Sequence, residues 1–263
     1  MSIVPVIEPS KFIALGPYGP LHGQVWQGAG DQVPILLLHD SLGCVTLWRD
    51  FPEKLAAATG RTVIAYDRAG FGQSVVRTAP VRSSFIADEA LEGVVPVLDA
   101  LGINKVVLLG HSVGGGMAVA AGASLPDRVA GLITISAQAF VEDLTLAGVR
   151  DAKVAFAQDG QVERLARYHG ERARWVLQAW IETWLAPNYV DWSLSPMLEK
   201  LTVPVLAMHG SQDEFGSARH PQMIANQSAG RGRMRMFKGV GHMPHKEVTD
   251  EVLAEVMGYL AKL

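Results

Sequence analysis

Residues 106–121 read VVLLGHSVGGGMAVAA. The first four residues form an apolar, strand-sized run, and the small residues from Gly114 onward are typical of a closely packed helix. A Gly-x-Ser-x-Gly motif between a strand and a helix places its serine on a sharp, strained turn that lifts the hydroxyl above the sheet. We therefore predict that Ser112 is a catalytic nucleophile, with Gly110 and Gly114 leaving room for the chain to reverse.

A glycine-rich turn between a strand and a helix is also found in phosphate-binding proteins, but two features argue against that function. No Walker lysine follows the glycines, and no G-x-G-x-x-G spacing is present. His111 lies inside the motif, but neighbouring side chains on such a turn diverge, so we interpret it as a structural residue and not as the base. The N–H of Val113, at the start of the helix, is expected to point at a developing oxyanion.

With this turn the chain resembles the α/β-hydrolase superfamily, and the resemblance extends over nearly its whole length. In that family the serine, the acid and the histidine follow in this order, on loops after successive strands. Residues 208–215, Met-His-Gly-Ser-Gln-Asp-Glu-Phe, resemble the acid loop with Asp213 in the acid position. Residues 239–244, Gly-Val-Gly-His-Met-Pro, resemble the histidine loop and contain His242. Glu214 is the alternative acid, although its side chain should diverge from that of Asp213.

These three residue types fit one mechanism. A serine hydroxyl is a poor nucleophile until a base takes its proton, and the base needs a fixed tautomer and a partner for its developing charge. The resemblance implies that His242 is the base and that Asp213 is its partner. It also implies that no cofactor is needed. The remaining histidines show no metal-ligand spacing, and neither H-E-x-x-H nor paired cysteines occur, so no metal is expected.

The oxyanion donors are expected on two loops. Residues 36–43, Leu-Leu-Leu-His-Asp-Ser-Leu-Gly, resemble the family's His-Gly loop, which supplies the second N–H. By position that N–H belongs to Ser41, with Val113 as its partner. Each such donor lowers the barrier by about 3 kcal/mol in other enzymes. The family's usual glycine after the histidine is replaced by Asp40, so the turn that places Ser41 is expected to differ.

A further loop resembles a structural motif of the family. Residues 67–74, Asp-Arg-Ala-Gly-Phe-Gly-Gln-Ser, are similar to the Asp-x-Arg-Gly-x-Gly-x-Ser loop. We interpret Asp67 and Arg68 as residues that fix a glycine turn behind the site, without a catalytic role.

The chain alternates short β-branched or aliphatic runs with helix-like segments. Strands are expected at 33–38, 62–66, 105–109, 129–136, 203–209 and 233–237, and helices at 46–58, 84–101, 114–125, 221–229 and 249–263. This alternation predicts an α/β fold with a mostly parallel central sheet flanked by helices. The resemblance implies that it is the α/β-hydrolase fold.

The alternation stops between residues 137 and 201, where the sequence is helical and rich in aromatic residues. We expect an inserted helical cap at 137–201 and a core formed by 1–136 and 202–263, because a long structureless loop is costly to order. More than half of the six tryptophans lie in this insert. Phe140 and Trp184 are expected to contact the substrate; the alternative is that such rings dock the insert onto the sheet.

Composition excludes several other functions. The net charge of −3 and the pI of about 6.2 give no overall attraction to nucleic acid. The longest apolar runs are far shorter than the ~20 residues that span a bilayer. The single cysteine, Cys44, excludes an internal disulfide, and residues 1–11 lack the features of a secretory signal. We expect a cytoplasmic protein with a small-molecule substrate and with neither a nucleic-acid nor a membrane partner; its oligomeric state stays open.

The resemblance makes acyl transfer to water the leading reaction. An aromatic cap favours a small to medium, largely apolar ester, as for a carboxylesterase. The alternative within the class is an enol-lactonase or a carbon–carbon bond hydrolase, whose substrates carry carboxylates and need a cation in the pocket. The insert offers candidate arginines for that cation, namely Arg150, Arg164, Arg167, Arg172 and Arg174. Outside hydrolysis, a cofactor-free perhydrolase or oxygenase and a non-catalytic small-ligand binder remain alternatives.

Overall fold

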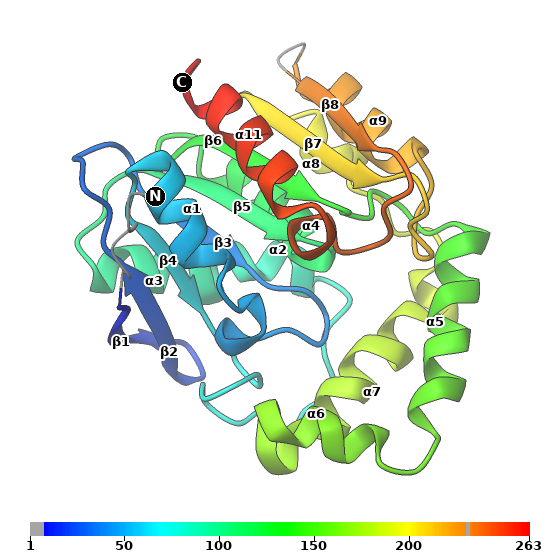
Figure 1. The fold of residues 1–263 in the computed structure, drawn as a ribbon. Coiled ribbons are helices and arrows are strands. Elements are labelled where there is room, and N and C mark those ends of the chain that lie inside the picture. Colours follow the sequence, from blue (N-terminus) through cyan, green and yellow to red (C-terminus); the bar gives the residue numbers. More distant parts are fainter. Residues whose placement is uncertain (1–7, 230–231) are drawn as a thin grey trace.

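The chain folds around one eight-stranded sheet in a computed structural model, which describes residues 8–229 and 232–263 (Figure 1). Most of the N-terminal segment in which no secretory signal is expected therefore lies outside the described residues. The strands are β1 (Ser10–Gly16), β2 (Gly19–Trp26), β3 (Ile35–Leu38), β4 (Val63–Tyr66), β5 (Val106–His111), β6 (Val129–Ile135), β7 (Val205–Gly210) and β8 (Gly232–Phe237).

The α-helices are α1 (Phe51–Thr59), α2 (Phe85–Glu89), α3 (Val95–Ala100), α4 (Val113–Ser124), α5 (Asp143–Phe156), α6 (Gln161–His169), α7 (Ala173–Trp184), α8 (Ser195–Leu198), α9 (Arg219–Gln227), α10 (Pro244–Glu247) and α11 (Thr249–Leu260). Short 3-10 segments lie at Val45–Trp48, Gly170–Arg172 and Pro187–Tyr189, and a π-helical turn lies at Ala90–Val94. No helix within the described part of the chain is long and apolar enough to cross a membrane.

The strand order is β1-β2-β4-β3-β5-β6-β7-β8. Strands β3 to β8 are parallel to their neighbours, whereas β2 pairs antiparallel with both β1 and β4. The expected mostly parallel sheet is therefore confirmed. Because the carboxyl ends of parallel strands meet at one edge, the loops after β3 to β8 come together there.

Alternate residues of the central strands belong to two separate hydrophobic cores, one on each face of the sheet. Leu36 and Leu38 of β3 face α2, α3, α4, α8 and α9, whereas Ile35 and Leu37 face α1 and α11. Figure 1 shows the sheet between these two helical layers. Since the central strands are buried on both faces, their sequences are apolar throughout and not alternating.

The N-terminal hairpin of β1 and β2 was not among the predicted strands. It lies at the edge of the sheet, and β1 exposes the side chains of Ile13 and Leu15 by 62% and 79%. β1 carries the apolar run Phe12–Leu15, which is as long as the runs of β3 and β4, so this strand was missed although its sequence resembles theirs.

The helical character expected at 84–101 is confirmed, with a π-helical turn inside the segment. Pro96 has no N–H to donate and its ring crowds the preceding turn, so α2 and α3 are separated by the π-helical turn Ala90–Val94. This turn leaves Glu89 and Glu92 on the side that faces the loops after β3 and β4, where both line a pocket.

Between β6 and β7 the chain forms α5, α6, α7 and α8. Figure 1 shows α5, α6 and α7 on the side toward which the parallel strands point, beyond the edge of the sheet. Leu194, Leu198 and Leu201, from the end of this insert, belong to the core on the α4 side of the sheet. The insert thus covers the strand-end loops with its first three helices and returns to the core through its last segment.

Candidate active site

Ser112 sits between the last residue of β5 and the first residue of α4. Its backbone has φ 54° and ψ −125°, a strained conformation for a residue with a side chain. A Cβ on Gly110 would lie 2.1 Å from the carbonyl oxygen of Gly114, and a Cβ on Gly114 would lie 2.1 Å from that of Leu38. The turn predicted from the motif is present, and it requires glycine on both sides of the serine.

Asp213 follows β7 and His242 follows β8, and their side chains are in contact. Nδ1 of His242 lies 2.8 Å from both carboxylate oxygens of Asp213. Asp213 Oδ1 also accepts the N–H of Phe215 at 2.8 Å, and Oδ2 lies 3.2 Å from Nε2 of His209. Glu214, the alternative acid, acts on His242 through its charge and makes none of these contacts.

The Asp213 carboxylate shifts the pKa of its partner. Burial alone lowers the pKa of His242, but the hydrogen bond and the charge of Asp213 outweigh it, and the pKa lies above its usual value. For Asp213 burial raises the pKa, whereas the contacts with His242 and His209 lower it, and the net shift is downward. The pair therefore favours a carboxylate beside a basic imidazole.

Gln138 is a residue of the site that the sequence reasoning missed. It follows β6 at the same edge of the sheet, is almost fully buried, and accepts a hydrogen bond from Ser112 Oγ at 3.3 Å through its Oε1. Within the described residues, the Ser112 hydroxyl donates to Gln138 and makes no hydrogen bond with His242. The position of Gln138 shortly after a central strand was the one feature of the sequence that could have indicated it.

Asp40, which stands where the family usually has glycine, closes a hydrogen-bonded turn. The Gly43 N–H donates to the Asp40 carbonyl at 3.2 Å, and the Leu42 N–H donates to Oδ1 of Asp40 at 2.9 Å. The N–H groups of Ser41 and Val113 donate no hydrogen bond among the described residues. Both therefore remain available as the pair of oxyanion donors expected from the sequence.

The same carboxylate links the oxyanion loop to the other two loops of the site. Oδ2 of Asp40 lies 3.1 Å from Nδ1 of His111, and Nε2 of His111 lies 2.9 Å from the carbonyl oxygen of His242. Burial raises the pKa of Asp40, but the hydrogen bond and charge of His111 outweigh it and hold this pKa well below its usual range. His111 is thus structural, as predicted, and bridges Asp40 to the histidine loop.

A cavity of about 290 Å³ lies above Ser112. It is walled mainly by apolar side chains of α5 and α7, and its lining comprises Asp40, Ser41, Leu42, Ser112, Gln138, Thr145, Val149, Ala152, Ala155, Phe156, Trp180, Trp184, Phe215, His242 and Met243. The nucleophile, the base and the Ser41 loop therefore face one largely apolar space.

The two aromatic residues expected to contact the substrate have different positions. Trp184 lines the cavity, in agreement with the expectation. Phe140 is not among the residues that line it, so the cavity gives no support to that expectation. The Phe140 ring centroid lies 4.4 Å from that of His220, and the guanidinium carbon of Arg219 lies over the Phe140 ring at 4.9 Å from its centroid. These contacts with α9 dock the insert onto the core, and the Phe140 backbone bridges to Ser193 within the insert.

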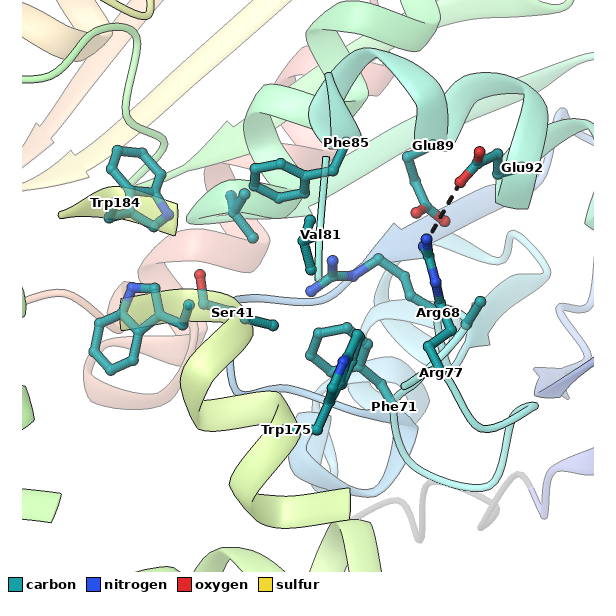
Figure 2. A pocket seen from close by; sticks show the side chains of 14 residues that line it. Ser41, Arg68, Phe71, Arg77, Val81, Phe85, Glu89, Glu92, Trp175 and Trp184 are labelled. Atoms are coloured by element: carbon teal, nitrogen blue, oxygen red, sulfur yellow. Dashed lines mark ion pairs between the residues drawn. The ribbon is translucent and has the colours of Figure 1, made fainter. Parts of the chain in front are cut away.

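A second, charged lobe adjoins the cavity (Figure 2). Ser41, Trp180 and Trp184 line both spaces, and Arg68 and Arg77 line the lobe together with Glu89 and Glu92. The five arginines of the insert that were candidates for a pocket cation line neither space.

The loop after β4 is structural only in part. Asp67 fixes the glycine turn as predicted, since its carboxylate accepts the N–H groups of Val45 at 2.7 Å and Gln73 at 2.8 Å. Arg68 was expected to lie behind the site, but its side chain lines the charged lobe. The sequence motif alone did not indicate the direction of that side chain.

Comparison with known proteins agrees with this geometry. A family model described as alpha/beta hydrolase fold matches residues 33–195. The 2-hydroxymuconate semialdehyde hydrolase of Pseudomonas sp. strain CF600 is 28% identical, over 96% of this chain and 93% of that protein. A thermophilic esterase from Thermogutta terrifontis has a similar fold, with a TM-score of 0.72 at 21% identity over 97% of this chain and 98% of the esterase.

Another relative is similar over a shorter stretch. The 1-acylglycerol-3-phosphate O-acyltransferase ABHD5 of Sus scrofa is 34% identical over 44% of this chain, and the match covers 33% of that protein. The family model, in contrast, matches more than half of the 263 residues and includes the predicted nucleophile. The chain therefore belongs to the α/β-hydrolase fold family.

Proposed function

We propose that this chain is a serine hydrolase that cleaves small to medium, largely apolar esters through an acyl-enzyme. The observation that carries the proposal is the convergence of three loops on one cavity. Ser112 at its strained turn, His242 at 2.8 Å from Asp213, and the Ser41 loop all border the same apolar space of about 290 Å³. A cavity of this size and character suits a compact acyl group.

Each residue has a role in the proposed reaction. Nε2 of His242 takes the proton of Ser112 as Oγ attacks the ester carbonyl, and the resulting imidazolium is stabilised by Asp213. The N–H groups of Val113 and Ser41 donate to the oxyanion. Collapse of the tetrahedral intermediate breaks the ester C–O bond, and His242 returns its proton to the leaving alcohol. Water, deprotonated by His242, then releases the acid and regenerates Ser112.

We propose the insert as a cap over this site. Helices α5 and α7 supply most of the apolar wall, including Phe156, Trp180 and Trp184. Closing an apolar wall over the acyl-enzyme excludes bulk water and strengthens the polar contacts inside. In this role the cap selects substrates by the shape of their apolar part.

A carbon–carbon bond hydrolase is the second candidate. It is favoured by the relative named 2-hydroxymuconate semialdehyde hydrolase, which aligns with nearly the whole chain. The arginines of the insert give it no support, because they lie outside the cavity and its lobe.

A substrate panel tests the two candidates together. Purified wild type and Ser112→Ala are assayed with p-nitrophenyl esters of two to eight acyl carbons and with 2-hydroxymuconate semialdehyde. We expect turnover of the shorter esters, and a loss of about 10⁴-fold or more in kcat for Ser112→Ala. Turnover of the semialdehyde with none of any ester would favour the second candidate. Retention of a ligand with negligible turnover of every compound would favour a binding protein.

A further inference from the structure

The charged lobe borders on Ser41 and Val113, the two residues proposed as oxyanion donors. It is a small space of about 30 Å³ whose lining includes Ser41, Val113 and Arg68. Figure 2 shows the Arg68 side chain extending toward Ser41 and Val81. A group bound in the lobe would therefore belong to the same molecule whose carbonyl lies at Ser112.

Arg68 is a buried cation with few partners. Its side chain is 4% exposed, and its Nε–H has no acceptor among the described residues. Nη2 donates to the carbonyl oxygen of Asp40 at 2.9 Å, and the guanidinium carbon lies 4.1 Å from the Phe71 ring centroid. None of the ion pairs of the described residues includes Arg68. Burying a charge in this way is costly unless an anion completes the site.

The carboxyl groups of the lobe do not supply that anion. Glu89 accepts the hydroxyl of Tyr66 and makes no ion pair with Arg68. Burial raises the pKa of Glu89 to about 7, so its charge is only partial at neutral pH. Glu92 is paired with Arg77 at 3.9 Å and with Arg82. Among the described residues, no carboxylate therefore lies within ion-pair distance of the Arg68 guanidinium, and the charges of Glu89 and Asp40 act on it only from further away.

We propose that Arg68 binds a carboxylate of the substrate, so that the preferred substrates are esters that carry a carboxylate a short distance from the reacting carbonyl. This proposal rests on the proposed acyl-transfer function. A planar guanidinium matches a carboxylate in shape and in hydrogen-bond direction. The lobe has room for little more than such a group, while the apolar remainder of the substrate occupies the larger cavity. Arg68 is then a specificity-determining residue.

The test compares two esters of the same acyl length. The mono-p-nitrophenyl ester of glutarate carries a terminal carboxylate, and p-nitrophenyl valerate ends in a methyl group. The readout is the ratio of their kcat/KM values, because a merely structural role of Arg68 would lower both values alike and leave the ratio unchanged. We expect Arg68→Met to lower the ratio about tenfold or more, the loss expected for one charge-assisted hydrogen bond. Arg68→Lys should recover part of it.

Arg174→Met is the matched control. Arg174 is an exposed residue of α7 that lines neither space, so its variant should keep the wild-type ratio. An Arg68→Met ratio equal to that of wild type would overturn the proposal.

A binding measurement separates this proposal from the hydrolase function. Ser112→Ala is titrated calorimetrically with monomethyl glutarate and with methyl valerate. We expect tighter binding of monomethyl glutarate, a loss of about tenfold or more when Arg68→Met is added, and a smaller loss when Arg68→Lys is added. If wild type hydrolyses no ester but this preference persists, the hydrolase function fails and the carboxylate site stands. If esters are hydrolysed and Ser112→Ala shows no preference, the carboxylate site is wrong.

Discussion

Ser112 donates its hydroxyl hydrogen bond to Gln138 Oε1, at an Oγ to Oε1 distance of 3.3 Å. Gln138 thereby competes with His242 for the proton that the base has to remove. Gln138 and His242 both line the cavity that we propose as the substrate site. The relationship makes Gln138 a positioning residue for the nucleophile.

Truncation of Gln138 should therefore release the serine. We expect Gln138→Ala to increase the rate of covalent labelling of Ser112 by a fluorophosphonate about fivefold, since one neutral hydrogen bond contributes about 1 kcal/mol. The second-order rate constant of labelling measures this effect. Gln178→Ala, the same truncation at an exposed position of α7, should label at the wild-type rate. Slower labelling of Gln138→Ala would show that Gln138 assists the nucleophile instead.

The pH dependence should report the titration of His242. Only the neutral ring accepts the serine proton, so kcat/KM for a neutral ester falls as the pH drops through the pKa of His242. Because the hydrogen bond and charge of Asp213 more than offset the effect of burial, this pKa is raised, and the midpoint should lie above the usual value of about 6.5.

Replacement of the acid supplies the control for that profile. In Asp213→Asn the contacts that raise the pKa of His242 are lost while its burial remains, so the midpoint should move down. The kcat should fall about 10⁴-fold, because the carboxylate no longer fixes the tautomer of the ring. A wild-type kcat/KM that stays constant down to a pH of about 5, well below that range, would remove His242 from the role of base.

Asp40 should contribute to both stability and rate. In Asp40→Ala, the Leu42 N–H and His111 Nδ1 lose their partner, and the turn that presents the Ser41 N–H is less restrained. We expect the free energy of unfolding to fall by about 1–3 kcal/mol and kcat/KM to fall about tenfold or more. Urea unfolding and steady-state kinetics measure the two effects.

Asp40→Asn should be intermediate, because its side-chain carbonyl still accepts the Leu42 N–H. If Asp40→Ala matches wild type in both measurements, the backbone alone holds the turn.

The glycines after Ser112 should differ in their tolerance of alanine. A Cβ on Gly114 would lie 2.1 Å from the Leu38 carbonyl oxygen, whereas the nearest atom to a Cβ on Gly116 lies at 3.5 Å, on the Ile86 side chain. We expect Gly114→Ala to lose labelling and most of its stability, and Gly116→Ala to gain up to about 1 kcal/mol from helix propensity. Urea denaturation compares them, and equal stability of the two variants would contradict the geometry of the turn.

The sheet was predictable where strands are buried on both faces. Strands β3 to β7 carry runs such as Ile35–Leu38 and Val106–His111 that pattern alone identifies, whereas the edge strand β8 was predicted although most of its residues are exposed or half-buried. The edge hairpin of β1 and β2 was not predicted, although β1 carries the apolar run Phe12–Leu15; Ile13 and Leu15 of that run are exposed in the folded chain. The π-helical turn before Pro96 depends on how the chain relieves one missing hydrogen bond, which periodicity does not show.

The predicted site residues lie in loops with short, recognisable motifs. Gln138 and the direction of the Arg68 side chain became evident only from the structure. Ser112, Asp213 and His242 each follow a central strand in a recognisable sequence, and the structure brings the last two into contact. Gln138 also follows a strand but belongs to no motif. Arg68 lies in a motif whose side-chain directions depend on the packing of Phe71 and Asp40 around it.

Covalent labelling followed by peptide mass spectrometry tests the central claim most directly. The account predicts that a fluorophosphonate adds one phosphonyl group to wild type, on the peptide that contains Ser112, and that its labelling abolishes ester hydrolysis. Ser112→Ala should remain unlabelled. Absence of labelling in folded wild type, or modification of a different residue with Ser112 left free, would contradict the assignment of Ser112 as the nucleophile.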